Sequence, residues 1–154
     1  MPKLYVLVGV PGSGKSTWIN NQDWTETCAI VSTDRHVEAY AQKQGRTYSN
    51  VFEEYMPTAV DLMAKDVLAA RSLGQDIVWD QTSTSRVSRH KKFVMLPHYY
   101  KIAVVFKTPD AEELQRRLAS RPGKIIPDHV VQNMIDQFEQ PSEMEGFDEI
   151  WFAN

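Results

Sequence analysis

The chain of 154 residues lacks several features that would place it in a special class. Its only cysteine is Cys28, which excludes an internal disulfide and is typical of a protein from a reducing cytoplasm. The four histidines show no metal-ligand spacing, so no structural metal site is predicted. No apolar run approaches the roughly 20 residues of a membrane helix, and the N-terminus is not of signal-peptide type. We therefore expect a cytoplasmic protein that does not associate with membranes.

The sequence also has no excess of positive charge, and its formal net charge is −3. This charge argues against a protein that binds nucleic acid through its overall field. Lysine and arginine concentrate in two segments, residues 86–92 and 116–124. Charge alone favours two solvated helix faces, although a local basic groove stays possible. The length and the 42% of hydrophobic residues predict one globular domain over residues 1–154, without repeats or linkers.

A phosphate-binding motif stands near the start of the sequence. Residues 9–17 read GVPGSGKST and follow the apolar run Leu4–Val8, which matches the P-loop pattern G-x-x-x-x-G-K-[ST]. Glycines let the backbone curl around phosphate oxygens, Lys15 reaches the β- and γ-phosphates, and the Ser16 hydroxyl ligates Mg²⁺. The motif predicts that the protein binds a nucleoside triphosphate with Mg²⁺. The residues assigned to the nucleotide are Gly9, Pro11, Gly12, Ser13, Gly14, Lys15, Ser16 and Thr17.

Short apolar runs alternate with helical patterns along the chain. The predicted strands are Leu4–Val8, Cys28–Val31, Asp76–Trp79, Lys101–Phe106 and Glu149–Phe152. The predicted helices are Lys15–Asn21, Arg35–Gln44, a long helix from Ser49 or Asn50 to Gly74, Ser85–Leu96, Thr108–Leu118 and Pro127–Phe138. This alternation is typical of an α/β fold in which a parallel sheet carries helices on both faces.

Two helices have further predicted details. The long helix is expected to bury an apolar face with spacings of three and four, and to bend at Pro57. The residues of that face are Phe52, Met56, Val60, Met63 and Val67. Thr108 is expected to cap the later helix, with Pro109 at its first position.

Two aspartates follow predicted strands at the edge where parallel sheets bind ligands. Asp34 comes after the second strand and Asp80 after the third. A carboxylate beside the acceptor hydroxyl can orient it and accept its proton during phosphoryl transfer. Asp34 is the preferred general base. Asp80 is the rival, or it could hold a Mg²⁺-bound water. Helix capping or a turn is the alternative role of each.

Two arginines flank the end of a predicted helix and precede a Pro-Gly turn. Arg117 and Arg121 have the pattern of a lid, because arginines on a closing loop can neutralise charge between the β- and γ-phosphates. The alternative is a surface pair that binds nothing.

Four segments together resemble the kinase domain of phage polynucleotide kinase and of animal polynucleotide kinase-phosphatase, within the AAA_33-type P-loop kinases. They are GVPGSGKSTW at 9–18, VSTD at 31–34, WDQTSTSRVSR at 79–89 and RRLASRPGKIIP at 116–127. The resemblance implies a nucleotide-kinase-like three-layer sandwich with a five-stranded parallel sheet in the order 2-3-1-4-5 and a short arginine lid.

The resemblance also implies roles for single residues. Lys15 and Ser16 would hold ATP and Mg²⁺, Asp34 would activate a hydroxyl of nucleic acid, and Arg121 would bridge phosphates of ATP, which makes Lys15, Asp34 and Arg121 the expected catalytic residues. Asp80, Thr82 and Arg89 would shape the acceptor side. From the residues themselves, Arg117 is a further expected nucleotide contact, and Asp80 is the expected metal ligand beside Ser16. A 5′-hydroxyl kinase would hold its acceptor strand in a groove lined by Arg35, Arg86 and Arg89, with Lys91 as a further candidate.

The sequence departs from this family pattern on the acceptor side. Phage polynucleotide kinase has an arginine three residues after its general base, where Val37 stands here. Position 83 is serine where asparagine is usual, and no phosphatase domain is present. The acceptor end of the site therefore differs from that of a standard 5′-end kinase.

Four functions stay open on these observations. The first is phosphorylation of a 5′-hydroxyl on DNA or RNA, with nucleic acid as substrate and no obligatory protein partner. The second is phosphorylation of a hydroxymethyl group on a modified pyrimidine, 5-hydroxymethyluracil, in phage DNA; a phage protein would act in the host cytoplasm. The third is a small-molecule acceptor such as a nucleoside or a sugar. The fourth is a non-catalytic nucleotide-binding module, against which an intact Lys15, Asp34 and Arg121 argue.

Overall fold

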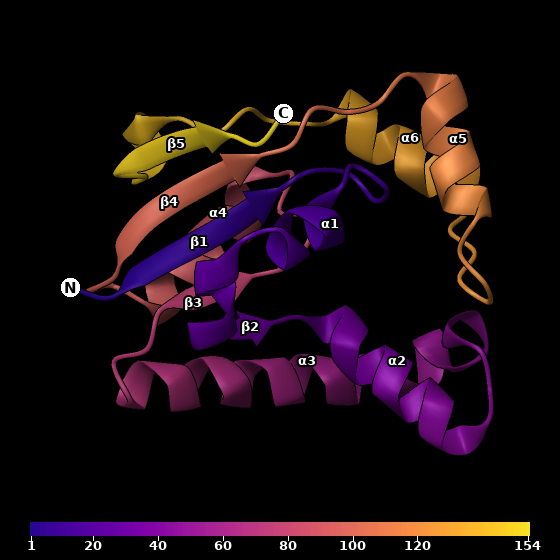
Figure 1. Ribbon diagram of the computed structural model, residues 1–154, viewed down its shortest axis with the longest axis horizontal. Coiled ribbons are helices and arrows are strands. Elements are labelled where there is room, and N and C mark those ends of the chain that lie inside the picture. Colours follow the sequence, from indigo (N-terminus) through magenta and orange to yellow (C-terminus); the bar gives the residue numbers. More distant parts are fainter.

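A five-stranded parallel sheet forms the centre of the molecule (Figure 1). The computed structural model describes all 154 residues, and its strands follow the order β2-β3-β1-β4-β5. Every neighbouring pair is parallel, so the predicted fold class and strand order are confirmed. The strands are β1 (Lys3–Val8), β2 (Ala29–Val31), β3 (Ile77–Trp79), β4 (Tyr100–Val105) and β5 (Glu149–Phe152).

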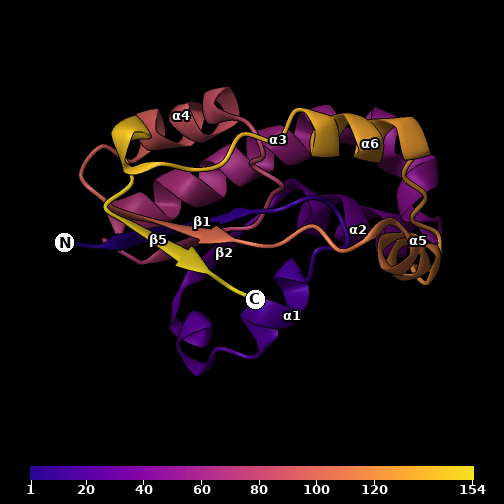
Figure 2. The same cartoon turned by 90° about the horizontal axis from the view of Figure 1, so that it is seen from above.

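Helices cover both faces of the sheet, as predicted. Figure 2 shows α3, α4 and α6 over one face, and α1 with the short turn η1 under the other. The helices are α1 (Lys15–Asn20), α2 (Thr33–Gln44), α3 (Tyr48–Ser72), α4 (Arg86–Met95), α5 (Ala111–Ala119) and α6 (Asp128–Asp136). Two 3₁₀ turns complete the structure, η1 (Asp23–Thr27) and η2 (Glu143–Glu145). None of the helices combines the length and the apolarity needed to cross a membrane.

The central strand β1 is buried on both sides, which explains its unbroken apolar sequence. Leu4, Val6 and Val8 belong to the larger core under α3 and α4. Tyr5 and Leu7 point to the opposite face, where the core includes Ile19 of α1. The strand is therefore fixed between both layers, and the P-loop at its carboxyl end starts from a rigid position.

Helix α3 begins earlier than the sequence predicted. Thr47 caps it, because its hydroxyl accepts the N–H of Asn50 while the Asn50 side chain accepts the N–H of Thr47. Ser49 does not cap the helix; its hydroxyl accepts the N–H of Ile125 from a distant loop. A similar correction applies to α5, which is capped by Asp110 and not by Thr108.

The predicted apolar face of α3 is partly wrong. Met63 and Val67 are buried, but Phe52 and Val60 are 39% and 45% exposed. The helix turns a neighbouring face inward, where small alanines allow a close approach to α2 and to the sheet. The buried residues on that face are Val51, Ala59, Met63, Val67 and Ala70. The helix runs without interruption through Pro57, and a bend there stays a prediction.

Candidate active site

The P-loop connects β1 to α1 and is fixed to the turn that follows β3. The N–H of Gly9 donates to the carbonyl of Thr82, at 2.9 Å, and so ties the loop to the turn after β3. A Cβ atom at Gly9 would lie 2.5 Å from Ser13 Oγ and 2.9 Å from Phe106 Cβ, so only glycine fits there. Gly14 has a φ of 105°, a conformation that other residues rarely adopt. The glycines of the motif are thus required by local geometry.

Lys15 is folded into the curve of this loop. Its Nζ atom donates to the carbonyls of Gly9 and Val10, each at 2.8 Å. Burial lowers the pKa of Lys15 to about 8, while the nearby carboxylate of Asp80 acts in the opposite direction. A phosphate group would replace these two carbonyls as the partner of the ammonium group.

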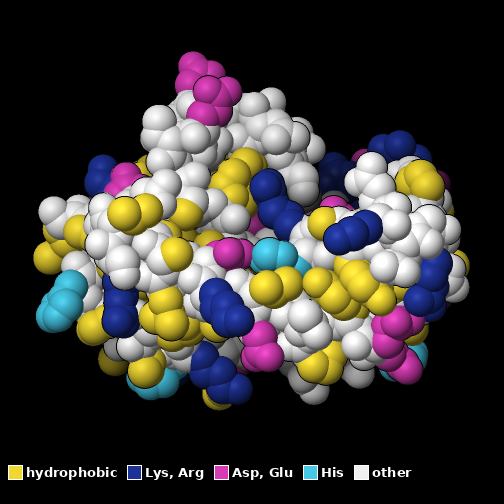
Figure 3. All heavy atoms as spheres, turned by 90° about the horizontal axis from the view of Figure 1, so that it is seen from below, with side chains coloured by type: hydrophobic (Ala, Val, Ile, Leu, Met, Phe, Trp, Pro, Cys, Tyr) yellow, Lys and Arg dark blue, Asp and Glu magenta, His cyan; other side chains and the backbone are white.

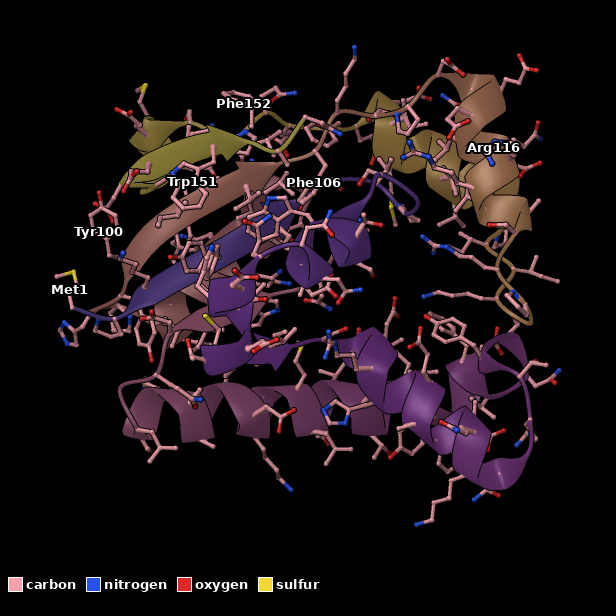
Figure 4. All side chains as sticks on the ribbon, in the orientation of Figure 1. Met1, Tyr100, Phe106, Arg116, Trp151 and Phe152 are labelled. Carbon is pink, nitrogen blue, oxygen red and sulfur yellow. The ribbon has the colours of Figure 1, made fainter.

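Arg117 supports the P-loop from the side of α5. Its Nη1 atom donates to the carbonyl of Gly12 at 3.0 Å, and its Nε atom donates to Glu113 at 2.8 Å. The hydrogen bond from Arg116, and after it the hydrogen bond from Arg117, lowers the pKa of Glu113 to about 2. Arg116 is labelled on α5 in Figure 4. The end of α5 and the P-loop therefore form one connected unit.

Asp34 lies in the first turn of α2, and two side chains from other segments occupy its carboxylate. The Tyr48 hydroxyl donates to Oδ1 at 2.6 Å. The Lys124 ammonium contacts Oδ2 at 2.9 Å. The Asp34 side chain keeps 46% of its surface exposed, so it is accessible to a ligand. No sequence motif points to Tyr48 or gives Lys124 a role, because both reach Asp34 only through the fold.

The segment 120–127 after α5, called the lid loop below, is docked on the start of α3. The N–H of Ser49 donates to the carbonyl of Gly123 at 3.0 Å, and the N–H of Ile125 donates to Ser49 Oγ at 2.8 Å. A Cβ atom on Gly123 would lie 2.9 Å from Thr47 Cβ. In Figure 4 side chains of this loop and of the start of α2 and α3 extend toward one another. The loop thus closes over Asp34.

The charge of Arg121 acts on the pKa values of two neighbouring side chains, Tyr48 and Lys15. Burial raises the pKa of Tyr48, and its hydrogen bond to Asp34 raises it further, while Arg121 lowers it. Arg121 also lowers the pKa of Lys15. The lid arginine therefore lies near both the P-loop lysine and the tyrosine beside Asp34.

Asp80 occupies a different part of the same site. It follows β3 directly, and its N–H donates to the carbonyl of Val31 at 2.8 Å. Burial raises the pKa of its carboxyl, while the charges of Lys15 and Arg35 lower it. Its carboxylate makes no hydrogen bond or ion pair within the protein. Asp80 is thus the unpaired acid beside Lys15, whereas Asp34 is the paired acid beneath the lid loop.

Thr82, Arg35 and Arg86 were also predicted to contact the acceptor, and the structure does not bring all three to Asp34 and the P-loop. Thr82 is half-buried and reaches the P-loop through its carbonyl, and Arg35 is exposed on α2. Arg86 is exposed at the start of α4, where its N–H donates to Glu139. No contact joins the Arg86 side chain to Asp34 or to the P-loop.

The assignment of Arg89 to the acceptor side is corrected by the structure. Its side chain is fully buried and makes a bidentate ion pair with Glu145, at 2.6 and 3.1 Å. It also donates to the carbonyl of Ser83 at 2.9 Å. Ser83 has a φ of 47°, a left-handed conformation that asparagine tolerates better than most residues. Arg89 therefore supports the turn after β3 from inside the protein.

Basic side chains do not form a continuous stripe on the face that bears α2 and α3. Figure 3 shows lysine and arginine scattered there among apolar and acidic groups. Positive charge at the site is local, and it comes from Lys15, Arg35, Arg121 and Lys124.

The sheet order, the P-loop after β1 and the lid loop after α5 define a P-loop kinase domain. The AAA_33 family, described as an AAA domain, matches residues 4–141, and this chain belongs to that family.

Solved structures of several kinds share the fold. A chain of the PezAT toxin–antitoxin system of Streptococcus pneumoniae has a TM-score of 0.73 and 18% identity, over 99% of this chain and 66% of that one. A chain of the Pnkp1/Rnl/Hen1 RNA repair complex has a TM-score of 0.64 and 27% identity, over 88% and 43%. A sugar kinase from a Janibacter species has a TM-score of 0.61 and 17% identity, over 99% and 86%. This chain thus spans less than half of the RNA repair protein.

Proposed function

We propose that this protein is an ATP-dependent kinase that phosphorylates a hydroxyl of nucleic acid, in the first place the 5′-hydroxyl of a DNA or RNA strand. The carrying observation is the position of Asp34, an accessible carboxylate close to Lys15 and beneath the arginine-bearing lid loop. The likeness to the RNA repair chain, at 27% identity, supports nucleic acid as the acceptor class.

The P-loop would bind the phosphates of ATP. The N–H groups of Gly12 and Gly14 donate to no protein acceptor and are free to bind phosphate oxygens. Ser16 and Asp80 fit Mg²⁺, because hydroxyl and unpaired carboxylate oxygens suit this ion together with phosphate. A bound Mg²⁺ would neutralise charge on the phosphate oxygens.

Asp34 would act on the acceptor. It orients the acceptor hydroxyl and takes its proton while the acceptor oxygen forms a bond to the γ-phosphorus. The bond between the γ-phosphorus and the β–γ bridging oxygen breaks, and its electron pair leaves with ADP. Arg121 neutralises the charge that develops there, and Asp34 then releases the proton to solvent.

A second candidate is a small-molecule hydroxyl. Val37 is fully buried in the core between α2 and α3, so no cation holds an acceptor phosphate at that place. Glu38 lies near Asp34 instead, within 3.5 Å of Lys124. The burial of Arg89 removes another expected contact. These observations favour an acceptor without phosphate.

A transfer assay with γ-labelled ATP and Mg²⁺ separates the candidates. The acceptors are 5′-hydroxyl DNA, 5′-hydroxyl RNA, free nucleosides, sugars, and 5′-phosphorylated DNA with or without 5-hydroxymethyluracil. We expect label on 5′-hydroxyl strands, with binding that weakens as salt rises. Label on blocked strands only when they contain the modified base would assign the base hydroxymethyl group as the acceptor. Label on small molecules alone would contradict a nucleic-acid acceptor.

The role of Asp34 is tested with Asp34→Asn. We expect turnover to fall by about 10²- to 10⁴-fold while ATP binding persists. Asp61→Asn is the matched control, because Asp61 is exposed on α3 and its side chain makes no hydrogen bond or ion pair. Normal turnover of Asp34→Asn would make Asp80 the preferred base.

A further inference from the structure

We propose that Lys124 is a positioning residue that keeps Asp34 from activating water until an acceptor is bound. This inference rests on the proposed role of Asp34 as the general base. It assigns the lid lysine a part in the choice between an acceptor hydroxyl and water, the small nucleophile that every kinase has to exclude.

The first argument is the occupancy of the carboxylate. Tyr48 donates to Oδ1 and Lys124 to Oδ2, so both oxygens of Asp34 already carry a hydrogen bond. The charge-assisted bond holds the Lys124 ammonium against Oδ2, where it takes a site that a transferred proton would occupy. In this arrangement Lys124 blocks the approach of a water proton to that oxygen.

The second argument is how firmly Lys124 is held. Its side chain is only 14% exposed, although it belongs to a loop. The Nζ atom lies 4.4 Å from the centre of the Tyr48 ring and 3.5 Å from Glu38 Oε1. An aromatic face and two carboxylates thus surround one ammonium group. An acceptor hydroxyl that hydrogen-bonds to Oδ2 therefore has to displace Lys124 from that oxygen.

The third argument is the connection to the lid loop. The residues on either side of Lys124 are docked on Ser49 by two hydrogen bonds, through the Gly123 carbonyl and the Ile125 N–H. Displacement of Lys124 therefore involves the same loop that carries Arg121. The step avoided is hydrolysis, in which a water oxygen bonds to the γ-phosphorus, ADP leaves with the electron pair, and Asp34 takes the water proton.

The test is ATP hydrolysis without acceptor, measured for Lys124→Met. We expect hydrolysis to rise by about threefold to tenfold over wild type. Lys124→Arg keeps the charge and should stay near wild type. Lys43→Met is the matched control, because Lys43 is exposed on α2 and its side chain makes no hydrogen bond or ion pair. Unchanged or lower hydrolysis in a folded Lys124→Met protein would overturn the proposal.

Hydrogen exchange supplies a readout that needs no activity. The N–H groups of Ser49 and Ile125 should exchange several times faster in Lys124→Met than in wild type. Unchanged exchange would show that Lys124 does not hold the loop, which also overturns the proposal.

The double variant Asp34→Asn, Lys124→Met tests whether Lys124 acts on hydrolysis through Asp34. If the rise in hydrolysis seen for Lys124→Met alone disappears in the double variant, Lys124 acts through Asp34. Persistence of that hydrolysis would show that Lys124 does not act through Asp34 and would overturn the proposal, although faster exchange would still show that Lys124 holds the loop. The proposed function is tested separately, by transfer to a nucleic-acid acceptor with Asp34→Asn alone.

Discussion

The hydroxyl of Tyr48 donates to Asp34 Oδ1 at 2.6 Å, across the junction between α2 and α3. The two residues are 14 positions apart, and the contact arises because α3 starts immediately beside the first turn of α2. While the hydroxyl binds Asp34, the face of the Tyr48 ring lies against the Lys124 ammonium. Tyr48 thus orients the Asp34 carboxylate with its hydroxyl and contacts the Lys124 ammonium with its ring.

Tyr48→Phe removes the hydroxyl and keeps the ring. We expect turnover to fall by about threefold to tenfold with ATP affinity unchanged, because one neutral hydrogen bond contributes about 1 kcal/mol and its loss lets the carboxylate rotate. Steady-state transfer kinetics measure this change. Tyr55→Phe is the control, since the Tyr55 ring stacks on Tyr40 and its hydroxyl makes no hydrogen bond. Wild-type turnover of Tyr48→Phe would show that the bond does not orient Asp34.

The affinity for ATP should depend on pH through Lys15. Because burial lowers the pKa of Lys15 to about 8, the ammonium form prevails below this pH and is lost above it. ATP binding requires the charged form, so the Kd should rise by up to about tenfold per unit above pH 8. Calorimetry across this range measures the change. Lys15→Met should bind more weakly and lose this part of the pH dependence; retention of the same profile would assign it to another group.

The buried pair of Arg89 and Glu145 should matter for stability. Arg89→Met leaves the Glu145 carboxylate buried without its partner, and we expect a loss of about 3–5 kcal/mol in the free energy of unfolding. Urea unfolding measures it. Arg86→Met, on the exposed side of the same helix, should change stability by less than about 0.5 kcal/mol. The double variant with Glu145→Met should recover part of the loss, and no recovery would argue against a direct pair.

Lys92 is buried over the Trp79 ring with only Ser88 as a hydrogen-bond partner. Burial, followed by the charges of Arg89 and Lys91, lowers its pKa from 10.5 to about 8. Below pH 8 the ammonium is charged in both states and its burial lowers stability. Between pH 8 and 10.5 the folded protein loses this proton first, so the free energy of unfolding should rise with pH.

Lys92→Met tests this effect. It should stabilise the protein by about 1–3 kcal/mol at neutral pH and remove the rise at alkaline pH. Urea unfolding at neutral and alkaline pH, with Lys91→Met as the exposed control, measures both. A variant that is less stable than wild type at neutral pH would mean that the bonds to Ser88 outweigh the cost of burial.

The fold could be predicted from the sequence because its signals are local. The apolar run from Leu4 to Val8 and the glycine spacing after it each predict structure within a few residues. Helix starts were less predictable, since Thr47 and Ser49 are both good capping residues. Thr47 forms the cap with Asn50, while the Ser49 hydroxyl binds Ile125 from a distant loop, a contact that no local pattern contains. The buried face of α3 also depends on packing that no local pattern contains.

The candidate site was predictable only where one segment supplies it. Lys15 follows from its motif. The pairing of Asp34 with Lys124 joins positions 90 apart, and that of Arg89 with Glu145 joins positions 56 apart. Such contacts depend on the path of the chain in space, so a sequence motif suggested an acceptor contact for Arg89 where the fold made it internal.

The face of the sheet under α1 carries an unusual group of aromatic rings. Trp18 follows the P-loop directly and meets Trp24 and Phe106 edge to face, and Trp24 meets Trp151 in the same way. Trp151 and Phe106 are labelled on this side of the sheet in Figure 4. Three of the four tryptophans of the protein thus form one chain of indoles that begins three positions after Lys15. The intrinsic fluorescence of the protein consequently reports on the helix that follows the nucleotide loop, and nucleotide titrations can be followed optically without any label.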